Sequence, residues 1–147
     1  MKIQIGNIFE HMGELDYVGI TTNSTLNNKG YLVMGAGNAK QAKEICPELP
    51  KVFGEQISRS CGNLGFYGLL KHDKYFALQT KLDWRDKSPI KVVSLSICKL
   101  NLAANKHPDK IFGVPFPAIN HGGLKEKDVL PMLLSLPDNV IIFKLEE

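Results

Sequence analysis

Two glycine-containing loops are the parts of this 147-residue chain best suited to bind a ligand. The first loop, residues 34–39, contains Gly35 and Gly37 and runs directly into a helical pattern. The second loop, residues 117–124, contains a Gly-Gly pair, follows an apolar strand pattern and also leads into a helical pattern. Main-chain N–H groups at the start of a helix have no intrahelical partner and lie at the positive end of the helix dipole, which suits a phosphate. Two such loops in one small chain predict a ligand with a pyrophosphate and a group attached at each end.

The charged and metal-ligating residues argue against several function classes. The formal net charge is +3, and the Lys and Arg residues are interspersed with acids instead of forming a nucleic-acid footprint. The three cysteines are widely spaced and odd in number, so they suggest neither a disulfide framework nor a CxxC metal pair. The four histidines form no HExxH motif and no close pair. We therefore expect no metal and no cofactor.

Apolar patterns predict strands and helices that alternate along the chain. Strands are expected at 2–5, 17–22, 64–70, 74–80, 111–116 and 140–145. Helices are expected at 37–46, 50–60, 88–104 and 125–136, and residues 8–15 fit a helical turn or a loop. Ser88 is the expected N-cap of the third helix, with Pro89 at its first position. Pro131 falls within the last of these helices, and a proline is tolerable only near the first turn, where an N–H has no partner anyway.

The length and the order of these elements predict the fold class. A chain of this size with 44% hydrophobic residues can bury one core, so residues 1–147 are expected to form a single domain. Helices between strands predict an α/β fold, a three-layer α/β/α sandwich with a central mixed sheet and ligands beyond the carboxyl ends of its strands. No apolar run reaches the roughly 20 residues of a membrane span, and the start reads as a strand instead of a signal peptide. We expect a cytoplasmic monomer without a membrane partner.

Five motifs, in order and at matching separations, resemble those of a macrodomain, the ADP-ribose-binding module. They are Gly6-Asn7-Ile8, Ile20-Thr-Thr-Asn23, Met34-Gly-Ala-Gly-Asn-Ala-Lys-Gln41, Thr80-Lys81 with Trp84-Arg85, and the second loop from Pro117 to Leu124. The chain is similar to the short phage and bacterial forms, which are related to terminal ADP-ribose glycohydrolases and to DNA ADP-ribosyl glycohydrolase antitoxins. The resemblance covers nearly the whole chain and implies a macrodomain-like fold.

The resemblance implies a place on ADP-ribose for each motif. Asn7 would contact the adenine, Asn23 would face the distal ribose, the first loop would hold that ribose and its phosphate, and the second loop would wrap the diphosphate. From the residues alone, Asn7 also fits a residue that stabilises a turn, and Asn23 fits an Asx-turn. The ligand-binding residues implied are Asn7, Ile8, Thr22, Asn23, Met34, Gly35, Ala36, Gly37, Asn38, Ala39, Thr80, Pro117, Ala118, Ile119, Asn120, His121, Gly122, Gly123 and Leu124.

Lys81, Asn23 and His121 are the catalytic candidates. In the glycohydrolase relatives, a lysine that follows a threonine attacks or polarises the anomeric carbon of the distal ribose, and Thr80-Lys81 fits that pattern. Such a lysine is expected to be buried, because burial disfavours its charged form and makes it nucleophilic. Lys81 also fits the alternative of a solvated run over residues 81–87. His121 is a candidate general acid or base near neutral pH, and its alternative is a surface histidine of the second loop.

Two functions follow from the resemblance. One is a hydrolase that removes ADP-ribose from a modified protein or nucleobase, or dephosphorylates ADP-ribose 1″-phosphate, with nucleic acid bound only as a modified substrate. The other is an ADP-ribose-binding module without turnover. Three departures from the family pattern favour the module: Ile20 replaces an Asn, Asn120 replaces a Gly, and Gly122 stands where the terminal glycohydrolases have the acid that partners the lysine. A third hypothesis is a nucleic-acid-binding domain, but the chain lacks the aromatic platform that such a domain would use.

Overall fold

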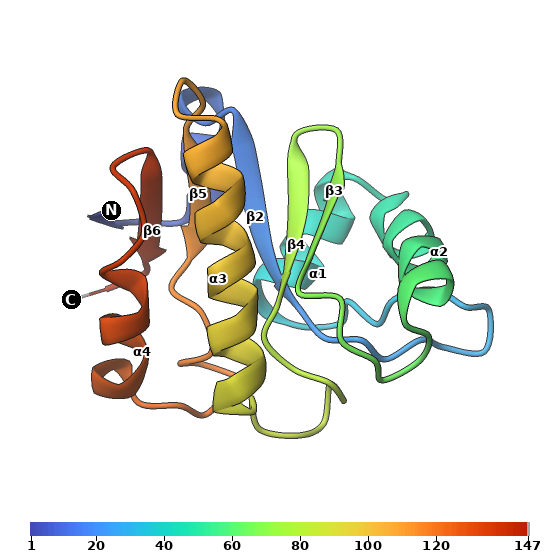
Figure 1. The fold of residues 1–147 in the computed structure, drawn as a ribbon. Coiled ribbons are helices and arrows are strands. Elements are labelled where there is room, and N and C mark those ends of the chain that lie inside the picture. Colours follow the sequence, from blue (N-terminus) through green and yellow to red (C-terminus); the bar gives the residue numbers. More distant parts are fainter. Residues whose placement is uncertain (147) are drawn as a thin grey trace.

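The computed structural model describes residues 1–146, which form a six-stranded sheet with helices on both sides (Figure 1). The strands are β1 (Lys2–Ile5), β2 (Tyr17–Thr22), β3 (Leu69–His72), β4 (Tyr75–Gln79), β5 (Phe112–Pro115) and β6 (Val140–Lys144). The helices are the 3₁₀ helix η1 (Ile8–Glu14), α1 (Gly37–Ile45), α2 (Leu49–Ser60), α3 (Ile90–Lys106) and α4 (Glu126–Leu133). The strand order is β1-β6-β5-β2-β4-β3, with β3 antiparallel to β4 and the other pairs parallel. The mixed sheet that the sequence predicts is therefore confirmed.

Two apolar cores, one on each face of the sheet, hold the helices in place. On one face, Val93 and Leu100 of α3 and Val129 of α4 pack with inward side chains of the strands. On the other face, Ala42 of α1 and Phe53 of α2 do the same. Figure 1 shows α3 and α4 side by side in front of the sheet, with α1 behind it. Successive strand residues point to opposite faces, so the strands supply both cores and the predicted three-layer α/β/α sandwich is confirmed.

β2 and β5 are neighbours that separate toward their carboxyl ends. They pair only at Tyr17–Phe112 and Val18–Gly113, although both strands continue beyond these residues. The chain also leaves them toward opposite faces, because β2 leads to α1 on one face and β5 leads to α4 on the other. In open α/β sheets, ligands bind at such a switch point, in the crevice outside the carboxyl ends of the strands.

The strand predicted at 64–70 begins later than the sequence pattern indicates, at Leu69. Leu64 and Gly68 have positive φ angles of 63° and 79°, which do not occur in regular strands. The main-chain N–H groups of Tyr67 and Gly68 donate to the side chain of Gln79 instead of to a neighbouring strand. Residues 64–68 are therefore a loop, because the buried side chain of Gln79 accepts main-chain hydrogen bonds that a strand would donate to its neighbour.

Ser88 does not cap α3 as the sequence predicts. The helix begins at Ile90 with Pro89 in the N-cap position, and Ser88 Oγ has no hydrogen-bond partner within residues 1–146. Ser88 is instead buried against the second loop, and its main-chain N–H donates to Gly122 O at 2.8 Å. This contact draws Ser88 away from the helix end and toward the loop.

Pro131 lies well inside α4, beyond the first turn in which a proline is tolerated without loss of a hydrogen bond. The helix also ends at Leu133, three residues before the predicted end at 136. A proline has no N–H to donate to the carbonyl four residues earlier, here that of Lys127. The helix is therefore weakened where the apolar pattern suggests that it continues.

Candidate ligand-binding site

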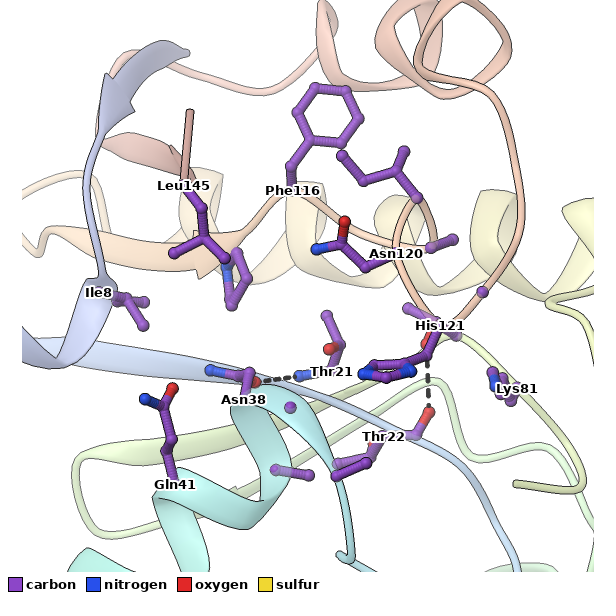
Figure 2. Close-up of a pocket in the computed structure, with 18 of the residues that line it drawn as sticks. Ile8, Thr21, Thr22, Asn38, Gln41, Lys81, Phe116, Asn120, His121 and Leu145 are labelled. Atoms are coloured by element: carbon purple, nitrogen blue, oxygen red, sulfur yellow. Dashed lines mark hydrogen bonds between the residues drawn. The ribbon is translucent and has the colours of Figure 1, made fainter. Parts of the chain in front are cut away.

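A cleft of about 1240 Å³ lies at the carboxyl ends of the strands, where β2 and β5 separate (Figure 2). Its volume is ample for a ligand of the size of a dinucleotide, since pockets for drug-sized ligands span roughly 300–1,000 Å³. The structure brings both loops together in this cleft with the ends of β2 and β4. The predicted site residues that line it are Asn7, Ile8, Thr22, Asn23, Met34, Gly35, Ala36, Gly37, Asn38, Ala39, Thr80, Lys81, Ala118, Ile119, Asn120, His121 and Gly122.

The first loop presents a row of main-chain N–H groups that have no protein partner. Within residues 1–146, the amides of residues 34–39 donate to no other group, because 34–36 precede α1 and 37–39 form its first turn. Ala36 occupies the N-cap position with no side-chain hydrogen bond, and the first turn carries no acidic residue. Gly37 has a φ of +57°, a left-handed conformation in which glycine is favoured. This end of α1 therefore offers its dipole and its amides to an anion.

The second loop faces the first across the cleft. The amides of residues 118–122 likewise have no hydrogen-bond partner in the described chain. A Cβ atom on Gly37 would lie only 3.3 Å from the His121 ring, so His121 reaches across to the start of α1. Figure 2 shows this histidine between the two loops, with Asn120 beside it. Two runs of unpaired amides thus converge on one cleft, as the sequence predicts, and this arrangement can bind two adjacent phosphates.

Gly122 has no room for any side chain. A Cβ atom there would collide with Ser88 Oγ and with the main chain of Ala118. Ala118 itself has a φ of +68°, which turns the loop sharply. The position at which the resemblance places an acid in the terminal glycohydrolases is therefore closed by packing in this chain, and a glycine is the residue that fits.

The side chain of Asn23 is largely engaged by the protein. Its Oδ1 accepts from Thr25 N–H at 2.9 Å, which is the Asx-turn that the sequence leaves open as an alternative. Its Nδ2 donates to Val33 O at 3.0 Å. Each amide atom retains one further hydrogen-bonding position, so Asn23 can still contact a ligand from a fixed orientation.

Lys81 lines the cleft but is only half-buried, which corrects the expectation of a buried lysine. Its Nζ donates to Trp84 O at 3.2 Å, and this contact folds the side chain back over its own loop. The neighbouring Thr80 is buried, and its N–H donates to Thr22 O at 2.8 Å. The main chain at Lys81 is therefore held firmly, while its ammonium group stays within reach of water and of a ligand.

The loop that follows Lys81 is braced by an ion pair between Asp83 and Arg85. The two guanidinium contacts are 2.7 Å from NH2 to Oδ2 and 3.1 Å from Nε to Oδ1, and Arg85 N–H also donates to Oδ1 at 3.0 Å. Hydrogen bonds from the Arg85 side chain, followed by the main-chain one, lower the pKa of Asp83 from its ordinary value of 3.8 to about 2. The carboxylate therefore stays ionised through the physiological range and fixes the turn beside the cleft.

Asp83→Asn is expected to lower the free energy of unfolding at pH 7, because the amide cannot replace the charged acceptor. The folded-state pKa is depressed, so the contribution of the carboxylate is complete above about pH 4 and is lost as the pH falls through about 2. The stability difference between wild type and variant, measured by urea unfolding, should shrink between pH 4 and pH 2. Asp109→Asn, at an exposed position, is the control. A difference that is equal at pH 7 and pH 2 would contradict the assignment.

The opposite end of the cleft is more apolar. Figure 2 shows Ile8 and Leu145 at this end, far from Lys81, with Phe116 above them. Asn7 also lines this end, and its Oδ1 accepts from Phe9 N–H at 3.0 Å, which caps η1. The turn-stabilising role that the sequence leaves open for Asn7 is thus present. A flat apolar group with a polar edge, such as a purine, matches this surface.

Asn38 fills the space that the separation of β2 and β5 leaves. Its Oδ1 accepts from the N–H of Thr21 at 2.8 Å, a strand amide on the side that faces away from β4 (Figure 2). Its Nδ2 is buried and has no partner within residues 1–146. Asn38 therefore gives the middle of the cleft wall a polar side chain of fixed orientation.

Three predicted ligand-binding residues do not line the cleft, namely Pro117, Gly123 and Leu124. Pro117 is buried, and Leu124 packs against the core beneath α3 and α4. A Cβ on Gly123 would face Lys87, which lies outside the cleft lining. These residues support the second loop from behind, because its ends must return to the sheet and to α4.

Several lining residues are absent from the set that the sequence predicts. Trp84 and Arg85 belong to the motifs that resemble the family, but the sequence predicts no role for them in the site. Most of the others lie at the ends of β5 and β6. The feature that could have identified them is that neighbouring parallel strands end at the same edge of a sheet. The additional lining residues are Gly6, Thr21, Val33, Gln41, Trp84, Arg85, Pro115, Phe116, Glu126, Phe143, Lys144, Leu145 and Glu146.

Residues 1–146 offer neither a cluster of metal-ligating side chains nor a helix that could span a membrane. This part of the chain contains no group of three or more His, Cys, Asp or Glu residues placed to hold a metal ion. None of its helices combines the length and the apolar character needed to cross a membrane.

No protein-family model and no curated protein sequence matches the chain, but solved structures do. The macrodomain of Thermus aquaticus DarG matches with a TM-score of 0.75 and 21% identity, over 99% of this chain and 97% of that one. Thermosipho africanus DarTG in complex with ADP-ribose matches with a TM-score of 0.76 and 20% identity. The macrodomain of Mycobacterium tuberculosis DarG matches with a TM-score of 0.70 and 21% identity, over 97% and 96% of the two chains.

The likeness is one of whole domains. The match to the Thermosipho africanus chain covers 98% of this chain and 42% of that longer one, so this chain corresponds to one part of it. At identities of 20% and 21%, the property that the structures share is the fold. The chain has the macrodomain fold that its five sequence motifs predict.

Proposed function

We propose that this protein binds ADP-ribose in the cleft between the two loops. The observation that carries the proposal is the pair of unpaired amide runs, residues 34–39 and 118–122, which face each other at the switch point of the sheet. An anion of two linked phosphates satisfies both runs at once. The similar Thermosipho africanus structure is a complex with ADP-ribose, which supports the choice of ligand.

The two ends of the cleft suit the two ends of this ligand. The apolar end with Ile8, Leu145 and Asn7 would take the adenine, whose exocyclic amine can donate to the second lone pair of Asn7 Oδ1. The end with Asn23 and Lys81 is polar and would take the distal ribose. The main-chain amides between them would donate hydrogen bonds to the diphosphate oxygens.

We further propose that the bound ligand is a substrate. The bond broken would join the anomeric carbon of the distal ribose to a protein or nucleobase group, or, in ADP-ribose 1″-phosphate, to the terminal phosphate. Water supplies the hydroxyl group of the product, and the leaving group takes up a proton. Lys81 would attack or polarise the anomeric carbon, Asn23 would orient the ribose, and His121 would transfer the proton.

A binding module without turnover is the second candidate, and two observations favour it. Gly122 has no room for the acid that partners the lysine in the terminal glycohydrolases. Lys81 Nζ is turned toward Trp84 O, so it would have to rotate before acting on a ribose. The binding proposal holds under both candidates, and only the reaction differs.

Calorimetric titration of the protein with ADP-ribose tests binding. A dissociation constant below about 100 μM is expected, and one no better than millimolar would remove both candidates together. Turnover is then assayed with ADP-ribosylated DNA, ADP-ribosylated protein and ADP-ribose 1″-phosphate, with products separated by chromatography. Tight binding with no product in any assay would leave the module, and product from one substrate would identify the acceptor.

A further inference from the structure

Gln79, the last residue of β4, is completely buried and connects three segments of the chain behind the cleft. Its Oε1 accepts from the N–H groups of Tyr67 and Gly68 at 2.8 and 3.0 Å. Its Nε2 is 3.2 Å from Ser24 Oγ, 3.0 Å from Gly65 O and 3.0 Å from Lys81 O. The side chain cannot be turned over, because the two main-chain donors require an acceptor where Oε1 lies.

The groups that hydrogen-bond to the Gln79 side chain belong to the segments that form the distal end of the cleft. Ser24 follows Asn23, and both its N–H and its hydroxyl donate to Leu82 O, at 2.9 and 3.2 Å. The carbonyl of Lys81 belongs to the residue whose ammonium lines the cleft. The buried side-chain amide of Gln79 therefore fixes the spacing between the segment that contains Asn23 and the segment that contains Lys81.

Tyr67 extends this network to the surface of the cleft. Its hydroxyl donates to Asn23 O at 2.6 Å and shares a hydrogen bond with Thr22 Oγ1. The phenol is buried, and burial raises its pKa far above the ordinary value, so the hydroxyl keeps its proton. Gln79 holds the main chain of Tyr67, and Tyr67 holds Thr22, the last residue of β2, and Asn23, which follows it at the cleft wall.

We propose that Gln79 and Tyr67 are positioning residues that shape the distal end of the cleft, and so set its preference for ADP-ribose over ADP. The inference rests on the proposed function. Neither side chain lines the cleft, so both act through Thr22, Asn23 and Lys81. A buried carbonyl or hydroxyl that loses its partner moves to find another, and such a shift at the distal wall disturbs contacts to the second ribose. The amide runs proposed to bind the diphosphate lie on other segments, and within residues 1–146 neither the Gln79 nor the Tyr67 side chain hydrogen-bonds to them.

Tyr67→Phe is the principal test, because it removes one oxygen and keeps the ring in the core. The measured quantity is the ratio of the dissociation constants for ADP and ADP-ribose, determined by calorimetry on each protein. The ratio is expected to fall at least fivefold, through weaker ADP-ribose binding, while the constant for ADP changes less than twofold. Tyr75→Phe, at a largely buried tyrosine of β4 that does not line the cleft, is the matched control and should leave the ratio unchanged.

Gln79→Met is the second variant, with Gln56→Met on α2 as its control, since Gln56 binds Lys71 O far from the cleft. General destabilisation lowers the folded fraction but does not change the ratio for the two ligands, so the ratio separates positioning from mere stability. If Gln79→Met does not fold, Tyr67→Phe alone decides. A ratio within twofold of wild type in Tyr67→Phe would overturn the inference, as would equal affinity of the wild type for ADP and ADP-ribose. A wild-type protein that binds neither ligand would instead overturn the proposed function.

Discussion

Ala36→Asp is expected to make the protein more stable and, at the same time, unable to bind ADP-ribose. Ala36 is the N-cap of α1, with the extended conformation of a cap residue (φ −149°, ψ 158°) and no capping hydrogen bond. An aspartate there accepts from the amides of the first turn and places its charge at the positive end of the helix dipole. Such a cap stabilises a protein by about 1 kcal/mol, which raises the Tm of a domain of this size by about 2–4 °C.

The same carboxylate occupies the amides that the proposed diphosphate needs. It also adds a negative charge beside a ligand that carries two. The loss of two or three charge-assisted hydrogen bonds, together with the repulsion, is expected to weaken binding at least 100-fold, or by about 3 kcal/mol. Stability and affinity therefore change in opposite directions, which a general disruption of the loop would not produce.

Thermal unfolding and calorimetric titration of the same preparations check both effects. Ala36→Ser provides a cap without a charge, so its gain in stability should be similar and its loss of affinity smaller. Lys125→Ser adds a cap at α4, which also lacks one, at a residue that does not line the cleft, and it should leave affinity unchanged. Should Ala36→Asp bind ADP-ribose within fivefold of wild type, the start of α1 is not the diphosphate site.

Local sequence patterns were sufficient to predict several of the strands and helices that position the site. The strands at 2–5 and 17–22 match the structure. The β-branched residues of 17–22 pack in the core, whereas the alternating residues of 2–5 form an edge strand whose isoleucines are exposed. The helix that begins at Gly37 is likewise indicated by its glycines and by small apolar residues at helical spacing. The first amides of a helix have no intrahelical partner, so the unpaired main-chain amides at the start of α1 could be predicted without a structure.

Other features depend on which segments become neighbours, and no local pattern reveals that. Phe116 and Leu145 meet in the cleft only because β5 and β6 lie in one sheet with β2. The loop at 64–68 is not a strand because Gln79, from another strand, takes its hydrogen bonds. A glutamine in an apolar strand is an exception to the sequence pattern, and only the structure reveals its five side-chain hydrogen bonds to segments behind the cleft.

Lys81→Ala is expected to reduce turnover at least 100-fold on whichever ADP-ribosylated substrate the wild type hydrolyses, while the affinity for ADP-ribose changes less than threefold. The Lys81 side chain lines the cleft, and its ammonium group donates to Trp84 O and hydrogen-bonds to neither loop within residues 1–146. Removal of a group that acts only on the developing charge or the anomeric carbon lowers kcat and spares ground-state binding. Single-turnover rates with enzyme in excess measure the chemical step directly.

Two further variants separate the roles that Lys81 could have in that step. Lys87→Ala removes a lysine of the same loop that does not line the cleft, and it should leave turnover unchanged. Lys81→Arg keeps the positive charge but replaces the amine, so turnover should persist in part if the lysine polarises the ribose and should vanish if it attacks. Full activity in Lys81→Ala would show that the reaction proceeds without this side chain. His121, which reaches across the cleft to Gly37, would then be the remaining group able to transfer a proton at that end.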